Sequence, residues 1–323
     1  MPEVEIVEVG PRDGLQNMPA AVPAATKVEL IRRILAAGFR RLELGSFVSP
    51  KAVPQMADTE EVVRALGDLP GVRGMALVPN LKGAERALAA GVTELLFVIS
   101  MSEAHNQSNV RRPISASIDD LRVLLSEIDA ERRLTIRVGL ATSFHCPFSG
   151  LVDEAQVLRN VEAILAIRDG LEFALSDTTG MALPAHVGSL ARQCLAQFGG
   201  SARFGFHGHD TAGYGVANVL AGYEAGLRCF DGSVAGLGGC PFAPGATGNT
   251  ATEDIVYVFA RMGVDTGIDL DRLLDAAELA AGLPGAATGG HVRAIPRDRL
   301  FRGSACRPVT QAASATQAAS AAA

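Results

Sequence analysis

Eight short runs of β-branched and other apolar residues alternate with longer amphipathic segments along most of this chain. This alternation is typical of repeated strand–helix units, in which the strands form a buried parallel sheet covered by helices. With eight such units we expect an α/β fold whose sheet closes into a (β/α)₈ TIM barrel. The predicted strands are Val4–Val9, Arg41–Gly45, Gly74–Pro79, Glu94–Ser100, Thr135–Thr142, Glu172–Asp177, Arg203–His209 and Cys229–Ala235.

Local signals mark where the connecting helices begin and end. The segment Thr26–Glu29 has the spacing of a capping box, which predicts a helix start at Thr26. Gly38, Gly91 and Gly226 lie where a glycine is expected to end a helix.

The chain after the eighth strand predicts more helix rather than a second core. Residues 251–263 and 270–283 have helical patterns and are expected to cover the barrel. From about residue 304 the sequence is rich in Ala, Ser and Gln and lacks bulky apolar residues. We therefore expect one catalytic domain over residues 1–300, including the covering helices, and a disordered tail over 301–323.

Charge and hydropathy exclude several classes of partner. A formal net charge of −6 provides no basic field for a nucleic-acid backbone, and no run of about 18 apolar residues could span a membrane. The pairs Arg32-Arg33 and Arg111-Arg112 are either solvated surface or a binding site for an anionic ligand such as a phosphate. Five cysteines without paired metal-type spacing, and no secretory leader, predict a reducing cytoplasm.

Polar residues gather after the first and seventh predicted strands. In a barrel of this kind the active site lies at the carboxyl ends of the strands. The first strand ends in a loop with Arg12, Asp13 and Gln16, and the seventh ends in His207-Gly208-His209, whose imidazoles project to the same side of an extended chain. Asp13, His207 and His209 together form a facial ligand set for an octahedral divalent ion.

Asn249 follows the eighth strand in the segment Thr247-Gly248-Asn249. Its side-chain carbonyl makes it a candidate fourth oxygen ligand of the metal. The alternative is an ordinary turn residue, and the residues themselves leave the two readings open.

The loop from Gly236 to Pro241 combines three glycines with a thiol. Gly238 and Gly239 precede Cys240, an arrangement that suits a mobile flap closing over a bound substrate. A phosphate-cradling loop is not expected, because the segment has neither the lysine nor the hydroxyl of that motif. The remaining alternative is a buried, unreactive cysteine.

Two further strand ends carry polar residues toward the same mouth. Glu43 and Ser46 end the second strand, and Glu43 could fix Arg12 or orient a metal ligand. Asp177 and Thr178 end the sixth strand. For all four, capping or orienting a turn is the alternative to direct contact with a ligand. His145 lies near the mouth as well, and its role stays open.

The motifs that hold these residues resemble the 3-hydroxy-3-methylglutaryl-CoA lyase family, within the barrel enzymes that include the isopropylmalate and homocitrate synthases. The resemblance covers roughly residues 4 to 290, and its Gly-Gly-Cys-Pro flap is distinctive of the lyases. The matching runs are Val7–Asn17 (VEVGPRDGLQN), Ser46–Lys51 (SFVSPK), Val78–Gly83 (VPNLKG), Ser233–Pro241 (SVAGLGGCP), Ala246–Asn249 (ATGN) and Ala251–Asp254 (ATED).

This resemblance implies a retro-Claisen cleavage of a CoA thioester to acetyl-CoA and a keto acid such as acetoacetate. It implies Mg²⁺ or Mn²⁺ held at the positions of Asp13, His207, His209 and Asn249. It also implies that Arg12 stabilises enolate charge and that Cys240 is the catalytic thiol. For the base that removes the hydroxyl proton, Asp177 is favoured over His207, since a metal-bound imidazole nitrogen cannot take that proton. Substrate contacts are expected from Arg12, Gln16, Ser46, Thr178, Gly238 and Gly239.

The chain departs from the family pattern on two strands. Val138–Thr142 replaces a Gly-Tyr-Val-Ser-Cys segment, and Ala174 replaces a serine. These changes remove polar groups from the expected substrate pocket and enlarge it, so a related 3-hydroxyacyl-CoA is an alternative substrate.

Three other functions are alternatives. A Claisen-type acyl-CoA synthase would be expected to need a regulatory domain, for which this chain is too short. A metal-dependent thioester hydrolase would make Cys240 incidental, and a non-enzymatic barrel would have no reason to gather metal ligands. The resemblance also suggests a homodimer or higher assembly; an intersubunit disulfide through Cys306 is the less favoured idea in a reducing compartment.

Overall fold

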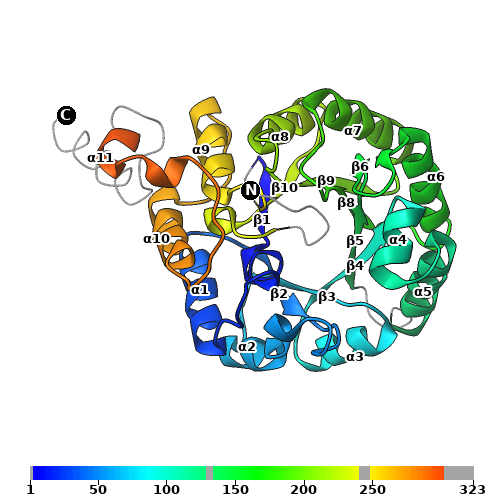
Figure 1. Ribbon diagram of the computed structural model, residues 1–323, viewed down its shortest axis with the longest axis horizontal. Coiled ribbons are helices and arrows are strands. Elements are labelled where there is room, and N and C mark those ends of the chain that lie inside the picture. Colours follow the sequence, from blue (N-terminus) through cyan, green and yellow to red (C-terminus); the bar gives the residue numbers. More distant parts are fainter. Residues whose placement is uncertain (1–2, 129–133, 240–247, 302–323) are drawn as a thin grey trace, which may run out of the picture.

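Eight parallel strands close into a barrel surrounded by helices, as the sequence predicts (Figure 1). The structure is a computed structural model and describes residues 3–128, 134–239 and 248–301. The strands follow one another around the barrel in the order β1-β2-β3-β4-β5-β8-β9-β10, and β10 pairs with β1 to close it. They are β1 (Glu5–Glu8), β2 (Arg41–Ser46), β3 (Arg73–Leu77), β4 (Glu94–Ser100), β5 (Thr135–Ala141), β8 (Glu172–Asp177), β9 (Arg203–Gly208) and β10 (Cys229–Gly232).

Helices connect successive strands and form the outer layer (Figure 1). A two-stranded hairpin of β6 (His145–Cys146) and β7 (Gly150–Leu151) follows β5. The α-helices are α1 (Ala24–Ala36), α2 (Thr59–Leu66), α3 (Leu81–Ala89), α4 (Glu103–Val110), α5 (Ile114–Ile128), α6 (Glu154–Leu165), α7 (Pro184–Phe198), α8 (Gly215–Glu224), α9 (Thr252–Met262), α10 (Leu270–Ala281) and α11 (Arg297–Leu300). Short helical turns are η1 (Gly10–Gly14), η2 (Pro54–Met56), η3 (Val234–Gly236) and η4 (Val292–Ala294).

The predicted helix ends are confirmed, but the predicted helix start is wrong. Gly38, Gly91 and Gly226 each follow a helix at positive φ, of 110°, 96° and 111°, which glycine adopts without steric cost. Helix α1 begins at Ala24, and the Thr26 amide donates to the carbonyl of Pro23. Proline fixes the φ that starts this helix, so Thr26 lies inside the first turn and does not cap it.

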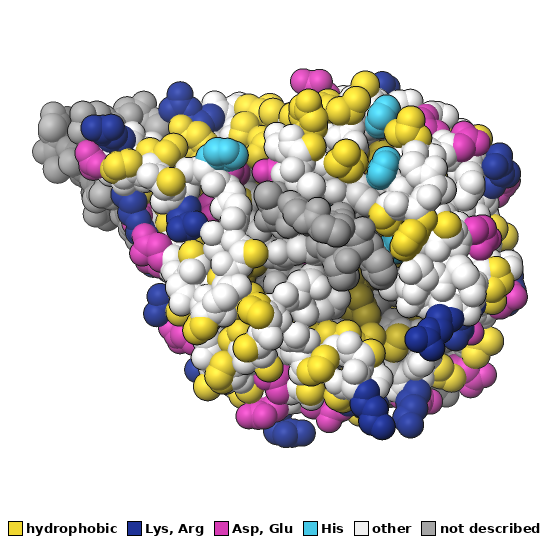
Figure 2. Space-filling model, in the orientation of Figure 1, with side chains coloured by type: hydrophobic (Ala, Val, Ile, Leu, Met, Phe, Trp, Pro, Cys, Tyr) yellow, Lys and Arg dark blue, Asp and Glu magenta, His cyan; other side chains and the backbone are white. Residues whose placement is uncertain are grey.

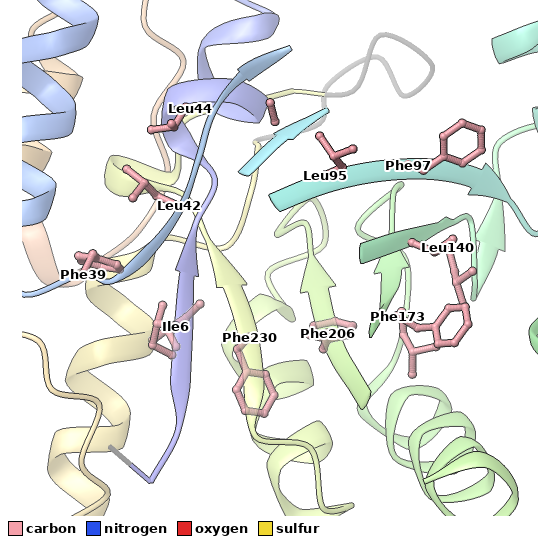
Figure 3. Close-up of a cluster of buried hydrophobic side chains, with 14 of the residues drawn as sticks. Ile6, Phe39, Leu42, Leu44, Leu95, Phe97, Leu140, Phe173, Phe206 and Phe230 are labelled. Atoms are coloured by element: carbon pink, nitrogen blue, oxygen red, sulfur yellow. The ribbon is translucent and has the colours of Figure 1, made fainter. Parts of the chain in front are cut away.

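The hydrophobic core lies between the outer face of the barrel and the helices (Figure 3). Phe206 on β9 lies beside Phe230 on β10 in the strand register, and both are fully buried. Because side chains alternate across a strand, every second residue joins this layer while its neighbours face the barrel interior. Burial of each such phenylalanine contributes about 1.5–3 kcal/mol.

The barrel interior contains a small apolar cluster and a set of buried charges. Val7, Val9, Met75 and Leu96 form a small apolar cluster from β1, β3 and β4. Five strands contribute fully or almost fully buried charged side chains, three of them from the first residue of a strand. These are Arg41, Glu94, Arg137, Glu172 and Asp231.

Helices α9 and α10 pack against the barrel's own helices, as expected for a cover. Helix α10 contacts α1, and α9 contacts α8 (Figure 1). Both match the two helices predicted after the eighth strand. Among the described residues no helix has the length and apolar character needed to cross a membrane.

Candidate active site

A cavity of about 630 Å³ opens at the carboxyl ends of the strands. Figure 2 shows this face hollowed near its centre, with Lys and Arg side chains along one side. The cavity brings together residues that are far apart in the sequence, from the η1 loop, β2, β8, β9 and the segment after β10. Among the predicted site residues, those that line it are Arg12, Asp13, Gln16, Glu43, Thr178, His207, His209 and Gly239.

Asp13, His207 and His209 form one cluster of potential metal ligands. One ligand atom from each lies within 4.8 Å of the others. Asp13 Oδ2 is 3.8 Å from His207 Nε2 and 3.7 Å from His209 Nε2. These distances are too long for hydrogen bonds but fit three donors arranged around one ion, whose ligand distances are near 2 Å. The structure thus brings together the three residues that the sequence predicted.

Asn249 lies beside this cluster. Its Nδ2 donates to Asp13 Oδ2 at 2.9 Å and to the Leu237 carbonyl at 3.0 Å. Its Oδ1 is buried and accepts no hydrogen bond from any described residue, a situation that costs free energy unless another partner is bound. A carboxylate, two imidazoles and an unsatisfied amide oxygen fit a hard divalent cation.

The η1 loop places Asp13 through a tight turn after β1. The amide of Asp13 donates to the Val9 carbonyl at 2.7 Å. Gly10 allows this turn, since a Cβ there would lie 2.6 Å from Glu8 Oε1. The turn carries Arg12 into the cavity, where it donates to Glu43 Oε2 and, at 2.5 Å, to Asp13 Oδ1.

The charges around Asp13 favour its ionised form. Burial alone would raise its pKa, but Arg12 and the two histidines hold that pKa well below the ordinary value. Burial raises the pKa of Glu43, and the charge of Arg12 opposes that rise. Glu43 therefore orients Arg12 from inside the cavity, one of the two roles considered for it from the sequence.

Asp231 on β10 was missed by the sequence analysis. Its Oδ2 lies 3.1 Å from His207 Nδ1. Burial alone would lower the pKa of His207, whereas this hydrogen bond and the charge of Asp231 raise it. A signal did exist in the sequence, because an acid within a strand that is otherwise buried is rare unless it is paired.

Asp177, the favoured base, does not line the cavity. Its two carboxylate oxygens accept the backbone amides of Met181 and Ala182 at 3.1 and 3.0 Å. The structure therefore gives Asp177 the turn-fixing role that was the alternative, between β8 and α7, and corrects its assignment as the base. Of the two candidates, only His207 lines the cavity.

Two predicted substrate contacts also lie outside the cavity lining. Ser46 is buried, and its Oγ accepts the Val48 amide at 3.3 Å after a register shift in β2. Gly238, at φ 143°, passes so close to Asn249 that a Cβ would lie 2.5 Å from its Nδ2. Gly238 therefore allows close approach to a candidate ligand instead of contacting substrate.

Four other residues named from the sequence have different outcomes. Thr178 lines the cavity, and its Oγ1 accepts the Thr142 amide at 2.8 Å. His145 lies in the β6–β7 hairpin with its Nδ1 3.3 Å from Thr179 Oγ1, which gives it a local partner. Cys240 and Cys306 lie outside the described residues.

One wall of the cavity is apolar and built from small residues. Gly139 and Ala141 on β5 and Ala174 on β8 line it, together with Leu96 and Val98 on β4. Among the positions where the sequence departs from the family pattern, Gly139, Ala141 and Ala174 thus line the cavity, whereas Val138 and Leu140 belong to the hydrophobic core. This wall offers an acyl group apolar surface and no cation.

Two buried glutamates hold the turn that leads into the segment after β10. Glu8 accepts the amides of Gly10 and Val234, and Glu253 accepts the amide of Ala235, which sits at φ 59°. The other oxygen of Glu253 has no hydrogen-bond partner among the described residues. Burial raises the pKa of Glu253 from 4.5 to about 7.

The raised pKa of Glu253 predicts a pH-dependent loss of stability. A carboxyl whose pKa is higher in the folded state stabilises the fold at low pH, and this stabilisation is lost as pH rises from about 4.5 to about 7. The free energy of unfolding is measured in urea for Glu253→Gln and for the wild type. We expect the variant's value minus the wild-type value to increase by up to about 3 kcal/mol between pH 4.5 and 8. Glu29→Gln, on an exposed helix surface, is the control and should follow the wild-type pH profile. Parallel profiles for Glu253→Gln and wild type would contradict the prediction.

The fold and the site together define a barrel enzyme with a candidate divalent-metal site at its mouth. Residues 3–280 match the HMGL-like family. The chain is 42% identical to the (R)-citramalyl-CoA lyase of Chloroflexus aurantiacus over 86% of this chain and 90% of that protein. It is 40% identical to the hydroxymethylglutaryl-CoA lyase of Bacillus subtilis over 85% of this chain and 91% of that one.

Solved structures agree with these relatives. An HMG-CoA lyase from Acinetobacter baumannii, in complex with coenzyme A and 3-methylmalate, superposes with a TM-score of 0.84 at 38% identity, covering 95% of this chain and 97% of that one. The chain belongs to the HMGL-like family, and it is a carbon–carbon lyase. The family resemblance and the enzyme class expected from the sequence are confirmed.

Proposed function

We propose that this chain cleaves a 3-hydroxy-3-methylglutaryl-CoA or a close 3-hydroxyacyl-CoA by a metal-dependent retro-Claisen reaction. The observation that carries the proposal is the position of Arg12, whose guanidinium contacts Asp13 of the ligand cluster in the same cavity. This reaction needs a positive charge that stabilises the enolate, and it needs a site that binds a Lewis acid. Relatives named as CoA lyases, and one relative solved with coenzyme A, support the thioester class.

Asp13, His207, His209 and Asn249 would hold Mg²⁺ or Mn²⁺. The ion supplies Lewis-acid chemistry, which lowers the cost of ionising the substrate's hydroxyl group. The hydroxyl gives its proton to a water molecule in the open cavity, its oxygen becomes the ketone oxygen, and the C2–C3 bond breaks. The electron pair of that bond passes to the thioester enolate, whose charge Arg12 stabilises.

Cys240 is proposed to protonate the enolate carbon and so release acetyl-CoA. It follows Gly239 in the chain, and Gly239 lines the cavity. We expect Cys240→Ala to lower kcat by about 10²-fold or more, the usual contribution of a general acid, while leaving Mn²⁺ affinity unchanged. Cys194→Ala, at a buried thiol on α7, is the matched control for the loss of a cysteine. Turnover retained in Cys240→Ala would remove the thiol from the mechanism.

The proposed activity is tested by product analysis. The purified full-length chain is incubated with Mg²⁺ or Mn²⁺ and with thioesters that differ only around the carbinol carbon, namely 3-hydroxy-3-methylglutaryl-CoA, citramalyl-CoA and 3-alkyl analogues. Mass spectrometry should find acetyl-CoA with acetoacetate from the first and acetyl-CoA with pyruvate from the second. Free CoA without acetyl-CoA would select the hydrolase, and net condensation of acetyl-CoA with a keto acid would select the synthase.

The apolar wall bears on which acyl group is accepted. Of the cavity's arginines, Arg12 is paired with Glu43 and Asp13, Arg137 with Asp231 and Arg112 with Asp120. These pairings leave no unpaired arginine among the cavity's described residues for a substrate carboxylate, and an alkyl substituent would contact the wall of Gly139, Ala141 and Ala174. We accordingly propose that 3-alkyl analogues larger than methyl are cleaved as well.

Two further proposals from the sequence concern the location and the oligomeric state of the protein. A cytoplasmic location is supported by the cysteine pattern and by the free thiols of Cys146, Cys194 and Cys229. A homodimer or higher homo-oligomer is proposed from the family, and light scattering of the purified chain tests it.

A further inference from the structure

Two charged residues outside the predicted ligand set connect His207 to the other buried charges inside the barrel. Asp231 on β10 lies 3.1 Å from His207 Nδ1 through its Oδ2. Arg137 on β5 holds the same carboxylate with two nitrogens, Nη2 at 2.8 Å from Oδ1 and Nη1 at 3.1 Å from Oδ2. Arg137 is fully buried and Asp231 is 3% exposed, so water competes little for these bonds.

Arg137 is fixed from its other side as well. Its Nε lies 2.9 Å from Glu172 Oε1 on β8, an ion pair that lacks the alignment of a hydrogen bond. Glu172 in turn pairs with Arg41 at 2.8 Å, and Arg41 pairs with Glu94. A guanidinium with carboxylates on two sides has one favoured orientation, so Arg137 presents a fixed fork to Asp231.

The hydrogen bond to Asp231 assigns the tautomer of neutral His207. An ionised carboxylate can only accept, so the proton of the imidazole belongs on Nδ1. The lone pair is then on Nε2, which faces Asp13 Oδ2 across 3.8 Å. That is the protonation state a metal ligand needs.

His209 provides a contrast within the same cluster. Its Nδ1 is buried and has no hydrogen-bond partner among the described residues. The two imidazoles are thus held in different ways, and only His207 is oriented by a buried pair of charges. Because of this difference, an arginine that contacts Asp231 can affect the orientation of His207.

We propose that Arg137 and Asp231 are positioning residues for His207, so that divalent-cation affinity depends on an arginine that touches none of the ligand side chains. Asp231 sets the tautomer and ring orientation of His207, and Arg137 sets the orientation of Asp231. The inference rests on the metal site of the proposed function and is independent of which thioester is cleaved.

The test is the dissociation constant for Mn²⁺, measured by electron paramagnetic resonance on the metal-free, full-length protein without substrate. We expect Asp231→Asn to raise this constant by about ten- to hundredfold, the usual effect of losing a residue that orients a metal-bound histidine. Arg137→Lys keeps the charge but loses the two-pronged contact, and should raise it by roughly tenfold.

Arg41→Lys is the matched control. Arg41 is equally buried and belongs to the same charge network, but it contacts Glu94, Glu172 and Glu5 and not Asp231. It should cost comparable thermal stability while leaving the Mn²⁺ dissociation constant within about twofold of wild type. The double variant Asp231→Asn/Arg137→Lys should bind no more weakly than Asp231→Asn alone, because Arg137 acts through Asp231.

A second readout does not depend on the metal. Nitrogen-15 spectra of the histidine rings in the metal-free protein should show His207 with its proton on Nδ1, and Asp231→Asn should move the ring toward a mixture of tautomers. The inference is overturned if the wild-type proton is on Nε2, if Asp231→Asn leaves the Mn²⁺ constant unchanged, or if Arg41→Lys raises it as much as Arg137→Lys. A wild-type protein that binds no Mn²⁺ would refute the metal site itself, and this inference with it. Normal Mn²⁺ responses without any thioester cleavage would refute only the proposed reaction.

Discussion

Asp13→Ala is expected to abolish measurable Mn²⁺ binding and to lower kcat/KM by about 10³-fold or more. Asp13 is the only carboxylate of the three-residue ligand cluster, and its Oδ2 faces both imidazoles and Asn249. Changes to residues that only orient a ligand cost about ten- to hundredfold, so loss of the charged ligand itself should cost more. The measurements are Mn²⁺ titration by electron paramagnetic resonance and acetyl-CoA release from 3-hydroxy-3-methylglutaryl-CoA.

Asp120→Asn is the control for losing a carboxylate from the same cavity. Asp120 lines the cavity and pairs with Arg112, and it lies outside the ligand cluster. Its Mn²⁺ affinity should match that of the wild type. Asp13→Ala protein that keeps wild-type affinity would show that the cluster is not the metal site.

The barrel could be predicted because the alternation of strand and helix patterns is repeated along the sequence. Each of the eight strands lies within or closely overlaps a predicted run, and the two extra helices lie within their predicted ranges. The ends of elements were harder, because they depend on local backbone geometry. Strand β10 ends at Gly232, where the predicted run continues to Ala235, since the chain there turns into η3 with Ala235 at φ 59°.

The ligand cluster could be predicted for a similar reason. Asp13 and His209 follow strand ends, and His207 is the last residue but one of β9. A closed parallel barrel brings every strand end to one face. Proximity to a strand end does not give side-chain direction, however. Asp177 is the last residue of β8, yet its oxygens accept two backbone amides of the next turn.

Residues inside the strands were missed because their partners are distant in sequence. Arg137 and Asp231 are separated by 94 positions, and Arg41 and Glu172 by 131. Neither pairing has a local spacing that could reveal it. A charge in the middle of a buried strand indicates only that some partner must exist, since an unpaired charge there would be too costly.

Removal of Arg12 is the second large effect, and it separates the two halves of the proposed site. We expect Arg12→Met to lower kcat by about 10²- to 10³-fold, the usual cost of losing one group that stabilises developing negative charge. Its effect on the metal should be opposite in sign to that of Asp13→Ala. Arg12 Nη1 lies 2.5 Å from Asp13 Oδ1, so loss of this positive charge removes a competitor for the carboxylate, and Mn²⁺ should bind equally well or more tightly.

Arg12→Met would leave Glu43 buried and without its ion-pair partner, so a control must separate this effect from the loss of the guanidinium. Burial already raises the pKa of Glu43, and loss of the opposing Arg12 charge would raise it further, so the carboxyl should become neutral without unfolding the barrel. The double variant Arg12→Met/Glu43→Gln makes this neutral state explicit and should show the same loss of kcat. Turnover restored by the second substitution would mean that an unpaired Glu43, and not the missing guanidinium, had caused the loss. Arg12 would then serve to hold Glu43, and enolate stabilisation would need another cation.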